Sequence, residues 1–168
     1  GTIWFGILHA MAITSLLGKT ASTAALTVAS TDMDSAALDA VGGAMAKVDV
    51  LNFGSDQVVT ADAAKVTGNT LSVTGLSHSH SRLILNGTSD ADTINLSNVT
   101  ATANLPVVVT GLGGADTIQL GTGTFLLNYT GADDGGTTGD VVTNFDSASD
   151  AIFIGGNLKA SLGGSTDT

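Results

Sequence analysis

The 168-residue sequence contains no cysteine and no glutamate, one proline, and only five lysine or arginine residues. Without cysteine the chain cannot form disulfides or bind zinc through thiolates, and cysteine usage gives no information on whether its compartment is oxidising or reducing. Without glutamate it cannot carry an H-E-x-x-H zinc helix or use a glutamate as a catalytic acid or base. So few basic residues cannot form a track for nucleic-acid phosphates. Catalysis and nucleic-acid binding are therefore not expected.

All fifteen acidic residues are aspartates, and the formal net charge is −10. Aspartate favours turns and holds its carboxylate close to backbone carbonyls, which suits a hard cation such as calcium. Plain solubility is the alternative explanation of this composition. The 24 threonines and 22 glycines are typical of strands joined by tight turns. The composition therefore predicts a mainly β protein of the kind found on extracellular surfaces.

The chain divides into an apolar N-terminal arm, residues 1–50, and a Gly/Asp/Thr-rich β domain, residues 51–168. Residues 1–31 carry one charge, Lys19. A signal peptide would place a basic residue before the apolar run, and a transmembrane helix needs about 20 apolar residues. We interpret residues 1–31 as a segment that docks on a neighbouring subunit, giving a homo-oligomer or polymer. A place in the chain's own core is the alternative.

An amphipathic helix is expected within the arm. Large apolar residues recur at steps of three, four and three, which places them on one helical face: Leu38, Val41, Met45 and Val48. Asp34 or Ser35 can cap its start. The arm is therefore predicted to be partly helical.

A regular repeat organises the β domain. The segments "GTSDADTINL" (87–96) and "GLGGADTIQL" (111–120) agree at six of ten positions, and their starting positions differ by 24. Rows of this period align three sets of residues: Gly87, Gly111 and Gly135; Asp92, Asp116 and Asp140; Ile94, Ile118 and Val142. The repeat predicts a short parallel β-solenoid with about two strands and two turns per row. A β-sandwich is the alternative.

Each repeat also has a chemical pattern. In a turn, glycine exposes its carbonyl and aspartate supplies a carboxylate, while the aliphatic residue two positions later anchors the strand in the core. Carbonyl and carboxylate oxygens from stacked turns are ligands that calcium prefers. The structural alternative is that these residues only form turns closed by side-chain hydrogen bonds.

The segment "GLGGADTIQ" resembles the nonapeptide of RTX proteins, the hemolysin-type calcium-binding repeat, with Leu112 where a second glycine is usual. "GTSDADTIN" is a weaker copy, and "GDVVTNFDSASDAIFIGG" resembles the segment that closes such repeats in serralysin-type proteases and calcium-dependent bacterial S-layer proteins. In that family the turns on one side recur every two nonapeptides, which is a shorter period than the one found in this chain. The resemblance implies a β-roll-like solenoid, type I secretion, and calcium bound at Asp90, Asp92, Gly111, Gly114 and Asp116. A second acidic cluster, in the loop "GADDGGTTGD", adds three candidate ligands, with a merely solvated loop as the alternative: Asp133, Asp134 and Asp140.

We therefore expect a structural subunit of an extracellular bacterial assembly, such as an S-layer, filament or adhesin, without a small-molecule substrate and with possible contact to a cell surface. The alternative is the non-catalytic C-terminal secretion and folding module of a larger secreted hydrolase or toxin. A phage capsid, spike or tail protein would share the same β-rich, threonine-rich composition.

His78 and His80 lie two residues apart, and we interpret them as surface or pairing residues because a stable metal site needs further ligands.

Overall fold

The computed structural model describes residues 24–28, 48–54, 56–75, 80–102, 105–131 and 133–155. Within these ranges every pairing between named strands is parallel. The elements follow in chain order: β1 (Ala24–Val28), β2 (Val48–Phe53), β3 (Val58–Asp62), the 3₁₀ turn η2 (Ala63–Lys65), β4 (Leu71–Gly75), β5 (Arg82–Asn86), β6 (Thr93–Asn95), β7 (Val99–Ala101), β8 (Val107–Thr110), β9 (Thr117–Gln119), β10 (Thr122–Gly123), β11 (Phe125–Tyr129), β12 (Val141–Thr143) and β13 (Ala151–Ile154).

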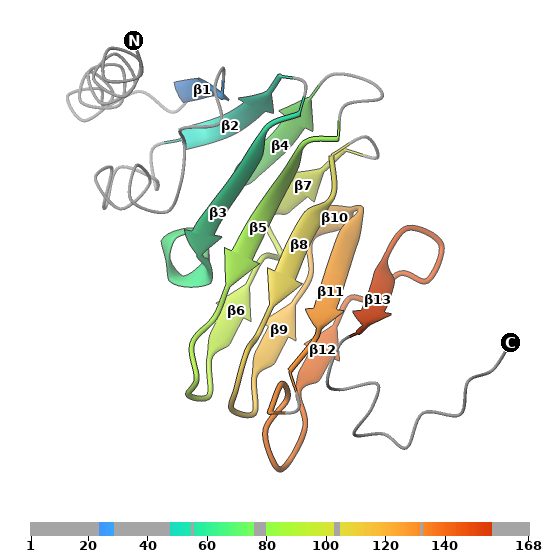
Figure 1. Cartoon of the computed structure of the whole chain (residues 1–168). Coiled ribbons are helices and arrows are strands. Elements are labelled where there is room, and N and C mark those ends of the chain that lie inside the picture. The colour runs from blue at the N-terminus through green and yellow to red at the C-terminus, as the bar shows by residue number, and fades with distance from the viewer. Residues whose placement is uncertain are drawn as a thin grey trace, which may run out of the picture.

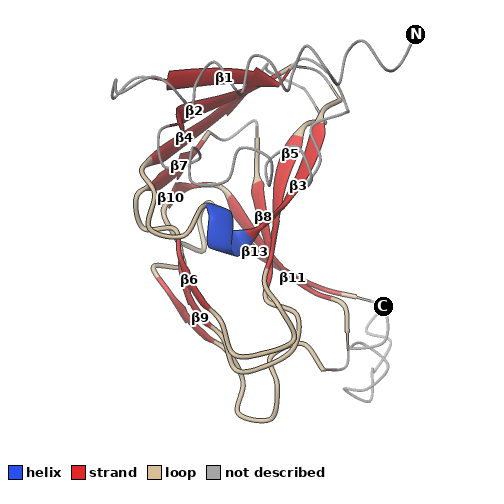
Figure 2. Cartoon of the chain, turned by 90° about the vertical axis from the view of Figure 1, so that its left-hand side faces the viewer, coloured by secondary structure: helices blue, strands red, loops and turns tan. Residues whose placement is uncertain are grey.

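The strands form three parallel sheets that wind as a β-solenoid of about four turns. Sheet A has the order β1-β2-β4-β7-β10, sheet B β13-β11-β8-β5-β3, and sheet C β12-β9-β6 (Figure 1). Sheet B lies opposite sheets A and C (Figure 2). The parallel pairing confirms the predicted solenoid and excludes the sandwich. Coils 2, 3 and 4 start at β4, β7 and β10, and each has three strands rather than the predicted two.

The core is built from side chains that stack from coil to coil. In sheet B, Leu83 lies beside Val107, which lies beside Phe125, and all three are fully buried. Sheet C repeats this arrangement with Ile94 and Ile118. Alternate residues of a strand point to opposite faces, so β5 and β11 bury every second side chain. Each buried aliphatic or aromatic side chain contributes about 1.5–3 kcal/mol.

The alignment of the repeats holds for the aspartates and aliphatic residues but is wrong for the third glycine. In sheet B, Phe125 pairs with Val107, an offset of 18, whereas in sheet C Val141 pairs with Thr117, an offset of 24. Coil 4 therefore has a short corner before β11 and a long loop, residues 130–140, after it. In this loop the Gly135 N–H donates to the Leu112 carbonyl at 3.2 Å and Asp134 forms a bridge with Gly113, so Gly135 lies beside Leu112 and Gly113 and not beside Gly111.

The partly helical character predicted for residues 1–50 is not supported. Ala24–Val28 forms strand β1, parallel to β2, and Val48, the last residue of the predicted helix, begins β2. The remainder of that helix, and most of residues 1–31, lie outside the described residues. In the described part of the chain, no helix has the length and apolar character needed to cross a bilayer.

Candidate metal centre

Three aspartates stack along the solenoid, one at the start of each strand of sheet C. Asp92, Asp116 and Asp140 directly precede β6, β9 and β12, which pair in register. The Asp92 N–H donates to Asp116 Oδ1 at 2.9 Å, and the Asp116 N–H donates to Asp140 Oδ1 at 2.8 Å. The carboxylates of Asp116 and Asp140 therefore cap the backbone of the preceding coil. We call these three residues the aspartate ladder.

The second carboxylate oxygen of each ladder residue has a different environment. Thr88 donates to Asp92 Oδ2 through its N–H at 2.5 Å and its hydroxyl at 2.9 Å. The Tyr129 hydroxyl donates to Asp140 Oδ2 at 2.8 Å. Asp116 is 1% exposed, and its Oδ2 is buried without a hydrogen-bond partner. The middle carboxylate therefore has an orphaned oxygen, which costs about 1–3 kcal/mol when left unsatisfied.

Sequence explains why coil 3 lacks the donor. Leu112 takes the place that Thr88 holds in coil 2, so it brings no hydroxyl. Its backbone adopts φ 67°, in the left-handed region that is uncommon for residues other than glycine. The departure of Leu112 from the repeat thus coincides with the orphaned oxygen.

Asp116 Oδ2 packs directly against Gly111. A Cβ at Gly111 would overlap Asp116 Oδ2 and would lie 3.4 Å from Asp140 Oδ2. The absence of a side chain at Gly111 therefore accommodates Asp116 Oδ2, and an oxygen of Asp140 lies close by. Carboxylate oxygens near each other are donors that suit a hard cation such as calcium, for which Asp116 and Asp140 would be the carboxylate ligands.

The electrostatics of the ladder favour a positive partner. Burial raises the pKa of Asp116; the hydrogen bond from the Asp92 N–H opposes this shift, and the negative charges of Asp140, Asp92 and Asp134 add to it. Burial, its hydrogen bond to Asp140 and the nearby carboxylates raise the pKa of Tyr129. Both groups therefore resist further negative charge, whereas a proton or a cation at Asp116 would relieve the repulsion.

The other predicted ligands lie outside the ladder. Asp90 has an exposed side chain, and its backbone packs against Gly114, which has φ 95°. Gly114 and Asp133 border a depression of about 520 Å³ with four further residues: Ser89, Gly113, Gly136 and Thr137. Asp134 Oδ2 accepts the N–H groups of Thr130 and Gly131 at 2.8 Å each. These aspartates belong to turns that surround the ladder.

No group of three or more histidine, aspartate or glutamate side chains in the described ranges is arranged as a metal site by itself. Backbone carbonyls, neutral side-chain oxygens or water would therefore supply the remaining ligands of any cation at the ladder. Sequence reasoning missed Thr88 and Tyr129 as partners of the ladder. Comparison of "GTSDAD" with "GLGGAD" could have identified Thr88, whereas no repeat signal marks Tyr129.

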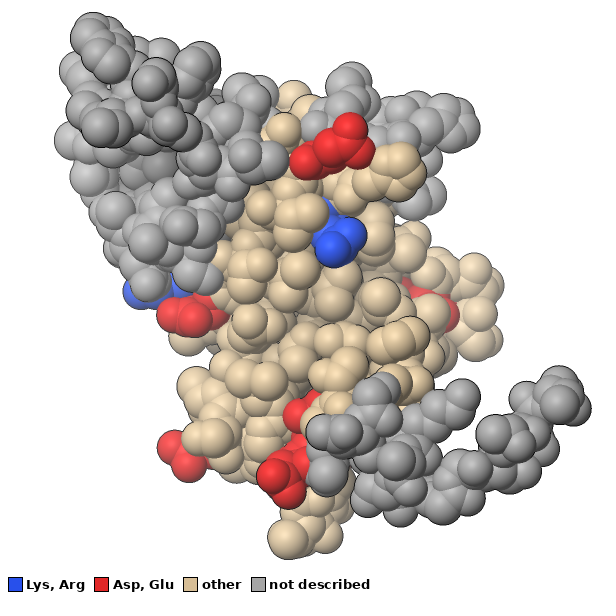
Figure 3. Space-filling model, in the orientation of Figure 1, with Lys and Arg blue, Asp and Glu red and all other residues tan. Residues whose placement is uncertain are grey.

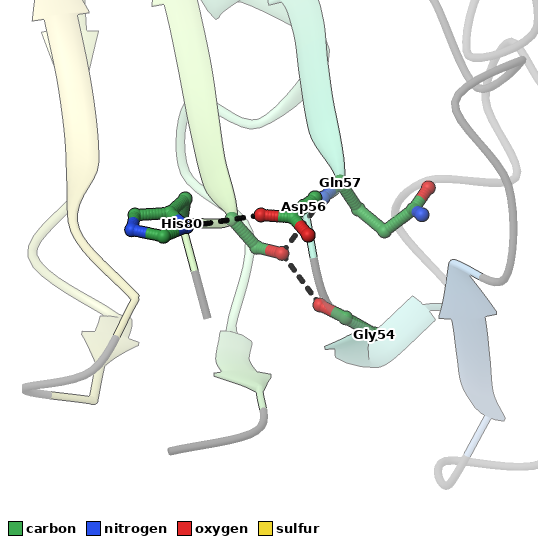
Figure 4. Close-up of polar contacts among 5 residues, drawn as sticks. Gly54, Asp56, Gln57 and His80 are labelled. Carbon is green, nitrogen blue, oxygen red and sulfur yellow. Dashed lines mark hydrogen bonds and ion pairs between the residues drawn. The ribbon is translucent and has the colours of Figure 1, made fainter. Parts of the chain in front are cut away.

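Histidine does not take part in the ladder. His80 Nδ1 lies 3.0 Å from Asp56 Oδ1, and both side chains are largely exposed (Figure 4). An exposed ion pair contributes at most about 1 kcal/mol. The pairing fits the interpretation of His80, while His78 lies outside the described residues. Beside this pair, the Ser81 hydroxyl accepts the Gln57 N–H at 2.8 Å.

Side chains cap the preceding coil at a second corner as well. Asp150 is 9% exposed, and its Oδ1 accepts the buried Phe125 N–H at 2.9 Å from 25 residues away. Its Oδ2 accepts the Asp146 N–H at 2.8 Å, which closes the turn before β13. Together with Ser81 and the ladder, Asp150 shows that a side-chain oxygen repeatedly bonds to the N–H of the coil before it.

The surface charge is unevenly distributed. On the face drawn in Figure 3, acidic side chains form several small groups, and basic side chains form only isolated patches.

Comparison with known proteins gives no match: no family model, no curated protein and no solved structure is similar enough to this chain to be assigned.

Proposed function

We propose that this chain is a structural subunit of an extracellular bacterial assembly, with a calcium ion stabilising its solenoid at the aspartate ladder. The observation that carries the calcium proposal is the orphaned Oδ2 of Asp116, which packs against Gly111 with Asp140 Oδ2 close to the same glycine. Neither a turn cap nor a solubilising charge requires a buried, unpartnered carboxylate oxygen.

Calcium at this position would supply positive charge to two adjacent carboxylates and complete the contacts of the orphaned oxygen. The chain's own residues do the positioning. The Asp92 N–H orients Asp116, and the Tyr129 hydroxyl together with the Asp116 N–H orients Asp140. Because the ladder joins consecutive coils, stabilising it stabilises their stacking. Folding would then depend on calcium concentration, which suits a protein exported from a low-calcium cytosol.

The structural role is supported by the architecture. A solenoid stacks its parallel strands into continuous sheets, and the strands at the ends of such sheets are places where other subunits can assemble. We propose no catalytic activity, since the sequence has no glutamate and few histidines. Secretion by a type I route remains part of the proposal through the resemblance to RTX proteins.

The alternative function is a non-catalytic C-terminal module of a larger secreted hydrolase or toxin. The observation that favours it is the position of β12 and β13, which close the described end of the solenoid in the segment that resembles the family's closing sequence. Electron microscopy of purified protein separates the two functions. Ordered filaments or sheets favour the structural subunit, and dispersed monomers favour the module.

The calcium proposal is tested by thermal unfolding, followed by circular dichroism, in calcium and in chelator. We expect calcium to raise the melting temperature of the wild type and to have little effect on an Asp116→Asn/Asp140→Asn double variant. Asp90→Asn is the matched control, because Asp90 is exposed and outside the ladder; it should respond to calcium as the wild type does. Equal melting curves of the wild type in calcium and in chelator would rule out the calcium site.

A further inference from the structure

The core of sheet B ends at a strand whose side chains are exposed. Buried Leu127 of β11 pairs with Ile152 of β13, so Ile152 is the next residue of the same core column. Ile152 is nevertheless 54% exposed, since in the described part of the chain no strand stacks beyond β13. Five large hydrophobic side chains are exposed on β12, on β13 or between them: Val141, Phe145, Ile152, Phe153 and Ile154. We call them the C-terminal end surface, and clustered apolar exposure of this kind marks an interaction site.

Strand β13 also has an open edge. It is the last strand of sheet B, and among the described residues only β11 pairs with it. The Gly155 N–H donates to the Tyr129 carbonyl at 2.9 Å. Because successive residues direct their backbone groups to opposite sides, Ile152 and Ile154 direct theirs away from β11. An exposed row of backbone donors and acceptors next to apolar side chains is a template for another strand.

The opposite end of sheet C is covered, in contrast to its C-terminal end. The turn after η2 closes the outer edge of β6: the Gly68 N–H donates to the Asn95 carbonyl at 2.8 Å, and the Asn95 N–H donates to Thr67 Oγ1 at 3.3 Å. At the C-terminal end β12 pairs only with β9 within the described ranges. The described ends of sheets B and C therefore lack, on this side, a cap like the one on β6.

Negative charge surrounds this apolar end. Residues 83–155 contain eight aspartates and no lysine, arginine or histidine. Exposed Asp146 lies in the turn that leads into β13. At the other end of the strand, Gly155 is bonded to Tyr129, whose hydroxyl donates to Asp140. Carboxylates therefore lie toward both ends of an apolar strand, so a partner with basic groups is attracted and a second C-terminal end is repelled.

We propose that the C-terminal end surface binds an extended segment of another protein that has apolar residues in its middle and basic residues at both ends. The segment adds to sheet B as a strand on the open edge of β13, where Ile152 and Ile154 supply backbone donors and acceptors. Its apolar side chains continue the core column that stops at Ile152. Its basic side chains lie toward Asp146 at one end and Asp140 at the other. This binding site goes beyond the proposed structural role and does not depend on calcium.

The test uses a labelled synthetic peptide with the full chain. The probe is acetyl-Lys-Lys-Ile-Val-Ile-Val-Lys-Lys-amide, which is about twice as long as the four-residue β13, so its lysines reach past both ends of the strand. One control peptide has glutamate in place of every lysine, and another has Gly-Ser-Gly-Ser in place of the apolar middle. Fluorescence anisotropy should show binding of the probe and of neither control. Raising the salt from about 0.1 M to about 1 M should weaken binding, because the Debye length falls from about 10 Å to about 3 Å.

Two variants separate the backbone and side-chain contributions. Ile154→Pro removes an N–H from the open edge of β13 and should weaken binding of the probe by up to about tenfold. Ile152→Lys replaces an apolar contact by a positive charge and should weaken binding by at least about tenfold. Thr100→Lys, at an exposed position in the middle of sheet A, introduces the same residue elsewhere and should bind like the wild type. Circular dichroism checks the fold of each variant, and Ile152→Lys carries the test if Ile154→Pro does not fold.

Three results would overturn the inference: no binding of the probe by the wild type at low salt, equal binding of the glutamate peptide, or unchanged binding by Ile152→Lys. Sedimentation velocity adds a fourth, because self-association of the wild type that Ile152→Lys abolishes would make a second copy the occupant. All samples are run in calcium and in chelator. A protein that calcium stabilises but that does not bind the probe refutes this inference alone. Binding of the probe without any effect of calcium on melting refutes the calcium site alone.

Discussion

Replacing Asp116 by asparagine should stabilise the calcium-free protein at neutral pH. Asparagine keeps the carbonyl oxygen that accepts the Asp92 N–H and removes the buried negative charge, which lies near three other carboxylates. A buried polar group without a partner costs about 1–3 kcal/mol when neutral and more when charged, so loss of the charge is the gain, and the weaker neutral hydrogen bond to Asp92 offsets about 1 kcal/mol of it. We therefore expect a net increase of about 1 kcal/mol in the free energy of unfolding.

The difference in unfolding free energy between the wild type and Asp116→Asn should depend on pH. Because folding raises the pKa of Asp116, the neutral carboxyl is favoured in the folded state. Its contribution to stability is present below the unfolded pKa, near 4, and is lost as pH rises through the folded pKa. Calcium-free wild type should therefore lose stability over this interval relative to Asp116→Asn. With calcium at 100 times its dissociation constant the wild type should gain about 2.7 kcal/mol, and the variant should gain little.

Denaturant unfolding between pH 4 and pH 8, with calcium and with chelator, measures both effects. Asp90→Asn is the control, since its carboxylate is exposed and has no place in the ladder. The reasoning would be refuted if Asp116→Asn lost stability in chelator by the same amount at every pH. That result would mean that the orphaned oxygen has a partner which asparagine cannot replace.

Three other substitutions test parts of the same turn by denaturant unfolding. Gly111→Ala should destabilise by at least about 2 kcal/mol and abolish the calcium response, because its methyl would collide with Asp116 Oδ2 and displace that carboxylate. Gly139→Ala, at φ 76° in open space, should cost only about 1 kcal/mol, and equal losses would contradict the steric argument. Leu112→Gly should stabilise by about 0.5–1 kcal/mol by relieving a left-handed backbone at a side chain that is 39% exposed, and a loss of stability would show that Leu112 packs usefully. Tyr129→Phe should destabilise by about 1.5–3 kcal/mol through loss of the hydroxyl that donates to Asp140, and an unchanged midpoint would show that water replaces it.

The solenoid and the alignment of Asp92, Asp116 and Asp140 could be predicted from the sequence because a regular repeat leaves a visible pattern. The third strand of coils 3 and 4 could not, because Val99–Ala101 and Thr122–Gly123 are very short and read as parts of turns. A change in corner length is equally hard to detect. In coil 4 the short corner and the long loop compensate each other. Strand β12 therefore keeps the 24-residue offset from β9, whereas β11 is offset from β8 by only 18 residues.

The environment of each carboxylate depends on contacts that sequence does not encode locally. Asp116 and Asp140 look alike in the aligned rows, yet of these two only Asp140 accepts a hydrogen bond from a hydroxyl, that of Tyr129 eleven residues earlier. The resemblance to RTX repeats indicated which aspartates to examine. Which oxygen lacks a partner became visible only with the coils stacked.

The direction of the capping bonds makes growth of the stack asymmetric. Oxygens of Ser81, Asp116, Asp140 and Asp150 each accept an N–H that lies 24 or 25 residues earlier in the chain. During synthesis from the N-terminus, the backbone N–H groups of a newly made coil therefore lack these acceptors until the next coil has been made. Truncation from the C-terminus leaves a backbone N–H donor of the new last coil without its acceptor. Truncation from the N-terminus leaves only a side-chain oxygen without its donor, and water can solvate that oxygen.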